Sequence, residues 1–237
     1  MLRTLTNVSS RFFTPLLDFF YPPTCLSCGI LLSDGERHVC SSCWASIKLV
    51  HPGLGLYLDT RAKLLASRMI DDLVAAFVFE KEGTFQHIAH ALKYTGFQSI
   101  GLELGKKVGE AMNSWRVRAD CLIPIPLHRR KLRERGFNQA ELIACGASAI
   151  TGIPVCADLV RRTRFTQTQT TLSLDERAKN VKDAFEIVPD GMPVVRGKSC
   201  ILIDDVITTG STIVACAHQL RAAGAERVIA ASSALAE

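Results

Sequence analysis

The stretch CILIDDVITTGSTI, residues 200–213, predicts more about the fold than any other part of the chain. Four consecutive apolar residues, 200–203, are typical of a parallel strand that is buried on both faces. Two acids, Asp204 and Asp205, follow where such a strand should end, and a helical pattern begins at Ser211. Open α/β sheets bind their ligands beyond the carboxyl ends of the strands. We therefore expect the acid pair to lie at a ligand-binding edge.

The loop that follows the two acids has the composition of a phosphate-binding turn. A glycine lets the backbone approach a phosphate without a Cβ in the way, and the N–H groups of the next helix attract anions. The loop and its hydroxyl donors comprise Thr208, Thr209, Gly210, Ser211 and Thr212. Carboxylates beside it suit a ribose diol, or a Mg²⁺ ion held by that diol. The alternative is an ordinary strand–turn–helix with surface acids, but the complete ordered string favours a sugar-phosphate site.

Outside this stretch, the chain alternates between apolar runs and helical patterns. Strands are predicted at residues 73–79, 120–126, 184–188, 199–205 and 227–235, and helices at 84–94, 99–115, 137–150 and 211–223. Gly224 is placed as a stop signal for the last helix. Strands that alternate with helices indicate an α/β fold with a mostly parallel, doubly wound sheet.

Two C-x-x-C pairs near the start of the chain have the spacing of a metal site. Cys25, Cys28, Cys40 and Cys43 form C-x2-C-x11-C-x2-C, which can present four thiolates to one structural zinc ion. The gap of eleven residues is shorter than the usual spacing of about 15–20, and a pair of disulfides is the alternative. The other five cysteines are scattered among apolar residues. This distribution favours zinc in a reducing cytoplasm over a disulfide framework.

The chain divides into three parts by composition. Residues 1–21 contain an apolar stripe that predicts a short amphipathic helix, although their basic, acid-free start also fits an organellar transit peptide. Residues 22–50 form the cysteine-rich ribbon, and HPGLG, residues 51–55, has the composition of a linker. Residues 56–237 form the α/β domain. No apolar run is long enough to span a membrane, so we expect a soluble protein.

Positive charge gathers between residues 116 and 135. This segment holds seven basic residues against two acidic ones, a surplus as large as that of the whole chain, whose net charge is +5. Such a cluster suits a polyanion, such as a pyrophosphate or a nucleic-acid backbone, although a solvated helix face has the same composition.

Several stretches together resemble a known family. The string DDVITTGST resembles the motif that binds phosphoribosyl pyrophosphate (PRPP) in type I phosphoribosyltransferases. In combination with the cysteine pairs and with LLDFFYPPTCLSCG (16–29), ALKYTGF (91–97), IPIPLHRRKLRERGFNQAELIA (123–144) and RRTRFTQTQTTLSLDERAKNVKDAF (161–185), it resembles the ComF family of competence-associated phosphoribosyltransferase-like proteins. The resemblance implies a type I phosphoribosyltransferase fold and a role in handling imported DNA. It also implies that Lys93 takes part in PRPP binding and that residues 166–177 form a mobile loop.

Two hypotheses about function follow from the resemblance. In the first, the protein is an enzyme that transfers a phosphoribosyl group from PRPP, with Mg²⁺, to an unknown acceptor. Asp204 and Asp205 then hold the ribose, while Arg133 and Arg135 neutralise the departing pyrophosphate. In the second, the protein binds PRPP or a nucleotide without turnover, while the zinc ribbon and the basic segment bind single-stranded DNA or a helicase partner. Its nucleic-acid contacts would be Arg129, Arg130 and Lys131.

Overall fold

The computed structural model describes residues 23–94, 96–163 and 184–237. The chain forms two compact units, residues 1–46 and residues 47–237. The predicted helix over residues 1–21 and the predicted mobile loop, residues 166–177, lie outside the described residues.

The first unit is a small ribbon built from short turns. An antiparallel bridge joins Thr24 to Leu31, and the Cys25 amide donates to the Ile30 carbonyl at 2.8 Å. Gly29 has a φ of 75°, so the chain can reverse tightly between the two. Helix α2 (Ser41–Ser46) closes the unit and carries the last cysteine of the pattern.

The second unit is built on a parallel sheet, as the sequence predicts. Its strands lie in the order β1 (Asp72–Val78), β6 (Arg227–Leu235), β5 (Ser199–Ile207) and β2 (Cys121–Pro124), and all neighbours are parallel. The predicted strand at 184–188 lies elsewhere. As β4 (Phe185–Ile187), it pairs antiparallel with β3 (Val160–Arg162) in a separate two-stranded sheet.

The helices of the second unit agree with the predicted ranges to within about two residues. They are α4 (Thr84–Tyr94), α5 (Gln98–Ser114), α7 (Gln139–Thr151) and α10 (Ser211–Ala222). The sequence did not predict α3 (Gly55–Ala66), because its apolar residues form no single stripe. The short helices α6 (Arg129–Arg135) and α9 (Met192–Val195) and the 3-10 turns Ala157–Leu159 and Pro189–Gly191 complete the unit. In the part of the chain that the structure describes, no helix is long and apolar enough to cross a bilayer.

Helices cover both faces of the parallel sheet. Successive strand residues point to opposite faces. One face packs Cys200 and Leu202 of β5 in a core that also contains Leu64 of α3 and Leu220 of α10. The other face is covered by α5, which contacts β1, and by α7, which contacts β2 and β5. This arrangement is the predicted doubly wound architecture.

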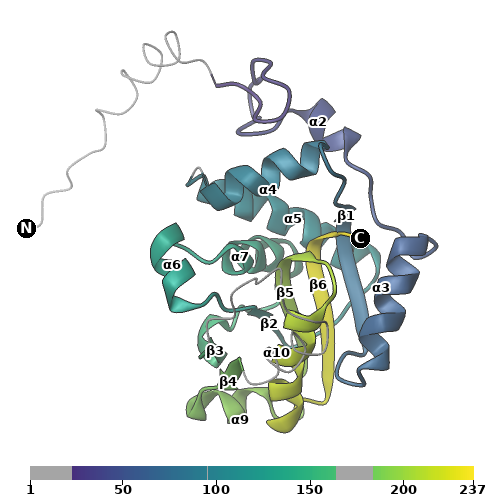
Figure 1. Cartoon of the computed structure of the whole chain (residues 1–237), viewed down its shortest axis with the longest axis vertical. Coiled ribbons are helices and arrows are strands. Elements are labelled where there is room, and N and C mark those ends of the chain that lie inside the picture. Colours follow the sequence, from purple (N-terminus) through teal and green to yellow (C-terminus); the bar gives the residue numbers. More distant parts are fainter. Residues whose placement is uncertain (1–22, 95, 164–183) are drawn as a thin grey trace, which may run out of the picture. The chain divides into compact units, whose positions relative to one another are not determined.

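Helices α5 and α7 lie side by side at unusually short range (Figure 1). A Cβ added to Gly105 of α5 would lie 2.2 Å from the Ile143 carbonyl oxygen of α7. A Cβ added to Gly146 of α7 would lie 2.2 Å from the Leu102 carbonyl oxygen of α5. Only glycine fits at either point, so these two positions set how closely α7 approaches α5.

Candidate functional site

The acid pair occupies the sixth and seventh of the nine positions of β5 (Ser199–Ile207). The sequence predicts that the strand ends at the acids, but β5 continues to Ile207 beside β6. On its other side the pairing with β2 ends at Pro124, opposite Ile203. The Ile125 amide still donates to the Ile203 carbonyl at 2.8 Å, and Pro126, which follows, has no N–H to donate. Within the described residues, no strand pairs with β5 beyond Ile203 on that side, where the two acids lie.

Lys93, at the end of α4, makes an ion pair with the second acid. Its Nζ atom lies 2.7 Å from Oδ2 of Asp205, and the two side chains are 28% and 22% exposed. The other carboxylate oxygen, Oδ1, accepts a hydrogen bond from the Val206 amide at 2.8 Å. The Ser233 hydroxyl of β6 donates to the Asp205 carbonyl. The Asp205 side chain is thus fixed by its own strand and by α4.

The two acids differ in their tendency to ionise. Burial raises the pKa of Asp204 above its usual value, and the negative charge of Asp205 raises it further. Burial also opposes ionisation of Asp205, but the Lys93 ammonium and the hydrogen bonds to its carboxylate outweigh burial and lower its pKa. The pair therefore carries less than two full negative charges near neutral pH.

The loop after β5 leaves several backbone donors available for a ligand. Gly210 has a φ of 74° and precedes α10. Within the described residues, no acceptor contacts the amides of Thr208, Gly210, Thr212 or Ile213. The Ser211 amide has a partner, the Thr209 hydroxyl at 3.4 Å, which is a weak hydrogen bond. Such a turn at a helix N-terminus can hold a phosphate.

Helix α6 presents two different faces. Arg130 pairs with Glu134 at 2.9 Å on a solvent-exposed face, with both side chains more than half exposed. Lys131 and Arg135, one turn apart, are half-buried, whereas Arg129 and Arg133 are exposed.

Lys131 belongs to the same charged cluster as the acid pair. Burial lowers the pKa of Lys131, and the positive charges of Arg135, Arg162 and Lys93 lower it further, while Asp205 opposes them. The sequence assigned Lys131 to nucleic acid and paired Arg133 with Arg135. In the structure, Lys131 shares the half-buried side of α6 with Arg135, and its charge interacts with that of Asp205.

Arg162 of β3 completes the cluster and was missed in the sequence. Burial lowers the pKa of its guanidinium, and the charge of Asp204 opposes this effect. The guanidinium carbon lies 5.4 Å from the ring centroid of Phe185 in β4. No local pattern marks this arginine, because it reaches Asp204 from a separate two-stranded sheet.

The basic segment 116–135 is not one surface. Arg116 and Arg118 precede β2, whereas α6 follows it. The two groups of basic residues therefore lie at opposite ends of this strand. Only the group on α6 is near the acid pair.

The four predicted zinc ligands converge. The Sγ atoms of Cys25, Cys28, Cys40 and Cys43 all lie within 4.8 Å of one another. The Sγ atoms of Cys28 and Cys40 are 3.8 Å apart, as expected for a tetrahedron with Zn–S bonds of about 2.3 Å. The amides of Cys40 and Cys43 donate to the Sγ atoms of Cys25 and Cys40 at 3.3 and 3.4 Å. Burial opposes ionisation of Cys25, but backbone donors lower its pKa to about 6. The donor set therefore fits a structural zinc ion.

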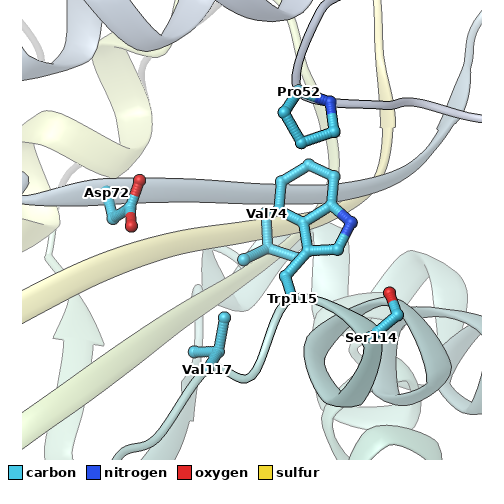
Figure 2. Close-up of a pocket in the computed structure, with 6 residues that line it drawn as sticks. All are labelled: Pro52, Asp72, Val74, Ser114, Trp115 and Val117. Atoms are coloured by element: carbon cyan, nitrogen blue, oxygen red, sulfur yellow. The ribbon is translucent and has the colours of Figure 1, made fainter.

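A hollow of about 540 Å³ is lined in part by Asp72, the first residue of β1 (Figure 2). The acid pair lies toward the C-terminal end of the parallel strand β5, so the hollow and the acids are at opposite ends of the strands. Figure 2 shows the Trp115 indole between Pro52 and Val74. Asp72 is already engaged by Arg61 at 2.9 Å and by Arg227 at 3.7 Å. The hollow thus contains none of the predicted site residues.

Comparison with known proteins gives a consistent result for both units. A model of the phosphoribosyl transferase domain matches residues 147–236, and a model of the double zinc ribbon domain matches residues 16–53. A solved glutamine PRPP amidotransferase from B. subtilis aligns with 57% of this chain and 26% of its own, at 25% identity and a TM-score of 0.40.

Two curated proteins are similar to this chain in sequence. Competence protein F of Haemophilus influenzae is 37% identical over 111 residues, 46% of this chain; the chain spans about half of that protein's length (47%). DNA utilization protein YhgH of Escherichia coli (strain K12) is 30% identical over 221 residues, which are 87% of this chain and 94% of that protein. Because the match to YhgH covers nearly all of both proteins, the chain belongs to the ComF family of competence protein F and DNA utilization protein YhgH.

Proposed function

We propose that the protein binds PRPP together with Mg²⁺ and transfers its phosphoribosyl group to an acceptor. One observation carries the proposal. Two carboxylates, Asp204 and Asp205, closely precede a turn with available amides, residues 208–212, and their charges interact with a cluster of cations from three other elements. Those cations are Lys93, Lys131, Arg135 and Arg162. Four positive charges near two acids, of which Asp204 is only partly ionised, leave a positive surplus, which suits a ligand with several negative charges.

Each part of PRPP has a matching group in this arrangement. The turn at Gly210 would hold the 5-phosphate through its amides and hydroxyls. The carboxylates would accept hydrogen bonds from the two ribose hydroxyls, since a carboxylate oxygen can accept two. Lys131 and Arg135 would neutralise the pyrophosphate as it departs. The positions of Arg133, Arg129 and Arg130 on the exposed part of α6 support a more peripheral contribution.

Transfer of the phosphoribosyl group needs no reactant other than PRPP and the acceptor. The bond between the ribose C1 atom and the pyrophosphate oxygen breaks, and its electron pair leaves with the pyrophosphate. A lone pair of the acceptor forms the new bond to C1, and the acceptor loses a proton to water or to an ionised carboxylate. The oxygen donors of Asp204 and Asp205 fit Mg²⁺, which would neutralise charge on the departing group.

Calorimetric titration with PRPP, with and without Mg²⁺, tests the proposal. Wild-type protein should bind PRPP more tightly with Mg²⁺. Asp205→Asn should weaken binding at least about tenfold, because a charged hydrogen-bond partner is lost. Asp190→Asn, the same change at an exposed position, is the matched control and should leave binding unchanged. No binding to the wild-type protein at millimolar PRPP would refute the proposal.

We also propose a role in handling DNA, as the names of the relatives suggest. We further propose that the protein acts in the cytoplasm. None of the nine cysteines, all of which lie in the described residues, forms a disulfide, in keeping with a reducing compartment. Single-stranded DNA and a DNA-uptake helicase are the partners that this role would involve.

The second candidate function is PRPP sensing without turnover, coupled to binding of single-stranded DNA. It is favoured by the exposed side chains of Arg129 and Arg130, which lie on α6 away from the acid pair. Replacing both with methionine should lower DNA affinity and reduce the slope of log affinity against log salt, while leaving PRPP binding intact. Release of pyrophosphate in the presence of any acceptor would decide for the enzyme instead.

A further inference from the structure

Gln139, the first residue of α7, is a buried polar side chain with a single side-chain partner. It is 2% exposed. Its Oε1 atom accepts a hydrogen bond from Nη1 of Arg135 at 2.9 Å. Its Nε2 atom is also buried and contacts no acceptor within the described residues. The contact with Arg135 also fixes which end of the carboxamide is oxygen, because the guanidinium can only donate.

This burial is unfavourable for the fold. A buried N–H group without an acceptor lowers stability, whereas an apolar side chain of the same size does not. Methionine has nearly the volume and the unbranched shape of glutamine and adapts to its surroundings. A residue selected only for packing would therefore be expected to be apolar here. The contact with Arg135 is the one interaction that methionine cannot make.

Hydrogen bonds fix the start of α7, which carries Gln139. Asn138 donates to the carbonyl of Ile125, just beyond β2, at 3.1 Å, and its Oδ1 atom accepts from the Ala140 amide at 3.2 Å. These bonds attach the start of α7 to the edge of the sheet. On the other side, Gly136 ends α6 with a φ of 79°. Arg135 thus lies just before an anchored segment and shares the half-buried side of α6 with Lys131.

We propose that Gln139 is a positioning residue that holds the Arg135 guanidinium ready for the pyrophosphate group of the ligand. The proposal rests on the proposed function and names a residue that it does not include. Arg135 makes this one side-chain hydrogen bond within the described residues, so the rest of its five N–H donors remain available for an anion. Holding the side chain in advance removes the entropy cost of ordering it on binding.

Three probes and two variants test the inference by calorimetry and thermal unfolding. The probes are PRPP, inorganic pyrophosphate and ribose 5-phosphate, each with Mg²⁺. Gln139→Met should weaken PRPP and pyrophosphate about tenfold and leave ribose 5-phosphate unchanged, because the turn at Gly210 is untouched. Its melting temperature should equal or exceed that of the wild type. Gln98→Met is the matched control, since Gln98 is the exposed first residue of α5. It should change neither the affinities for the probes nor the melting temperature.

A double-variant cycle separates positioning from a general effect. In an Arg135→Met background, Gln139→Met should cause no further loss of pyrophosphate affinity, because its only target is gone. Equal weakening of all three probes, or a lower melting temperature of Gln139→Met, would overturn the inference by showing a structural role. Wild-type binding of pyrophosphate but not PRPP would overturn the proposed function alone. Binding of neither would overturn both.

Discussion

Nζ of Lys93 lies 2.7 Å from Oδ2 of Asp205, so the last turn of α4 is joined to the edge of the sheet at the acid pair. The two residues are separated by more than a hundred positions in the chain. The ion pair keeps Asp205 ionised beside Asp204: burial opposes ionisation, but the Lys93 ammonium and the hydrogen bonds to the carboxylate lower the pKa of Asp205.

Loss of Lys93 should destabilise the protein more than loss of a surface lysine. In Lys93→Met, Asp205 would remain half-buried without its counterion, and we expect the free energy of unfolding at pH 7 to fall by about 2 kcal/mol. Lys107 pairs with Glu110 at the same kind of distance, 2.9 Å, but on the surface. Lys107→Met should therefore cost less than about 0.5 kcal/mol. Urea unfolding measures both.

The double variant Lys93→Met/Asp205→Asn provides the check on this explanation. It removes both partners and should recover most of the lost stability. A double variant as unstable as Lys93→Met would show that the lysine stabilises the fold through packing instead.

Asp204 should make stability depend on pH above the usual range of an aspartate. Because the pKa of Asp204 is raised in the folded protein, the folded state binds the proton more tightly than the unfolded state. The resulting stability is present at acid pH and is lost as pH rises through the raised folded-state pKa. An asparagine side chain would imitate the protonated acid, so Asp204→Asn should stabilise the protein increasingly from pH 5 to pH 9. A stability difference that is constant over this range would contradict the raised pKa.

Zinc should be required for the first unit. We expect about one zinc ion per chain by elemental analysis, and Cys40→Ser should abolish it, because Cys40 is a buried member of the four-thiolate set. Cys145→Ser, at an exposed cysteine outside the set, should retain the metal. A strong chelator should unfold residues 23–46 and leave the parallel sheet folded. Less than half a zinc ion per chain in protein never exposed to chelators would contradict the assignment.

The contact between α5 and α7 should not tolerate a methyl group. Gly105→Ala would place its Cβ atom 2.2 Å from the Ile143 carbonyl oxygen, and backbone cannot move aside as a side chain can. We expect a loss of about 3 kcal/mol or more in the free energy of unfolding. Gly55, at the start of α3, has nothing within 4 Å of an added Cβ, so Gly55→Ala should be neutral or slightly stabilising. Chemical denaturation of both variants makes the comparison, and equal stabilities would contradict the close approach.

Much of the fold could be predicted because its signals are local. The apolar run at residues 200–203, the acids, the turn and the start of α10 are contiguous, so one strand–turn–helix unit accounts for them all. The two cysteine pairs are equally local. Helix α3 escaped prediction because Tyr57 and Leu64 gain their burial from the sheet and not from a regular apolar stripe. Tertiary packing stabilises such a helix without marking it in the sequence.

By itself, the sequence determined the four strands of the parallel sheet, four of the helices around it, the four cysteines of the ribbon and the strand–turn–helix unit at Gly210. Only the tertiary structure decided which cations face the acids. Lys131 and Arg162 reach the acid pair, while Arg133 stays in solvent, because the phase of a short helix and the position of a separate two-stranded sheet are set by packing. The net charge of a segment does not show toward which part of the fold each side chain is directed. A cluster of charges forms a binding site only where the side chains are directed to the same place.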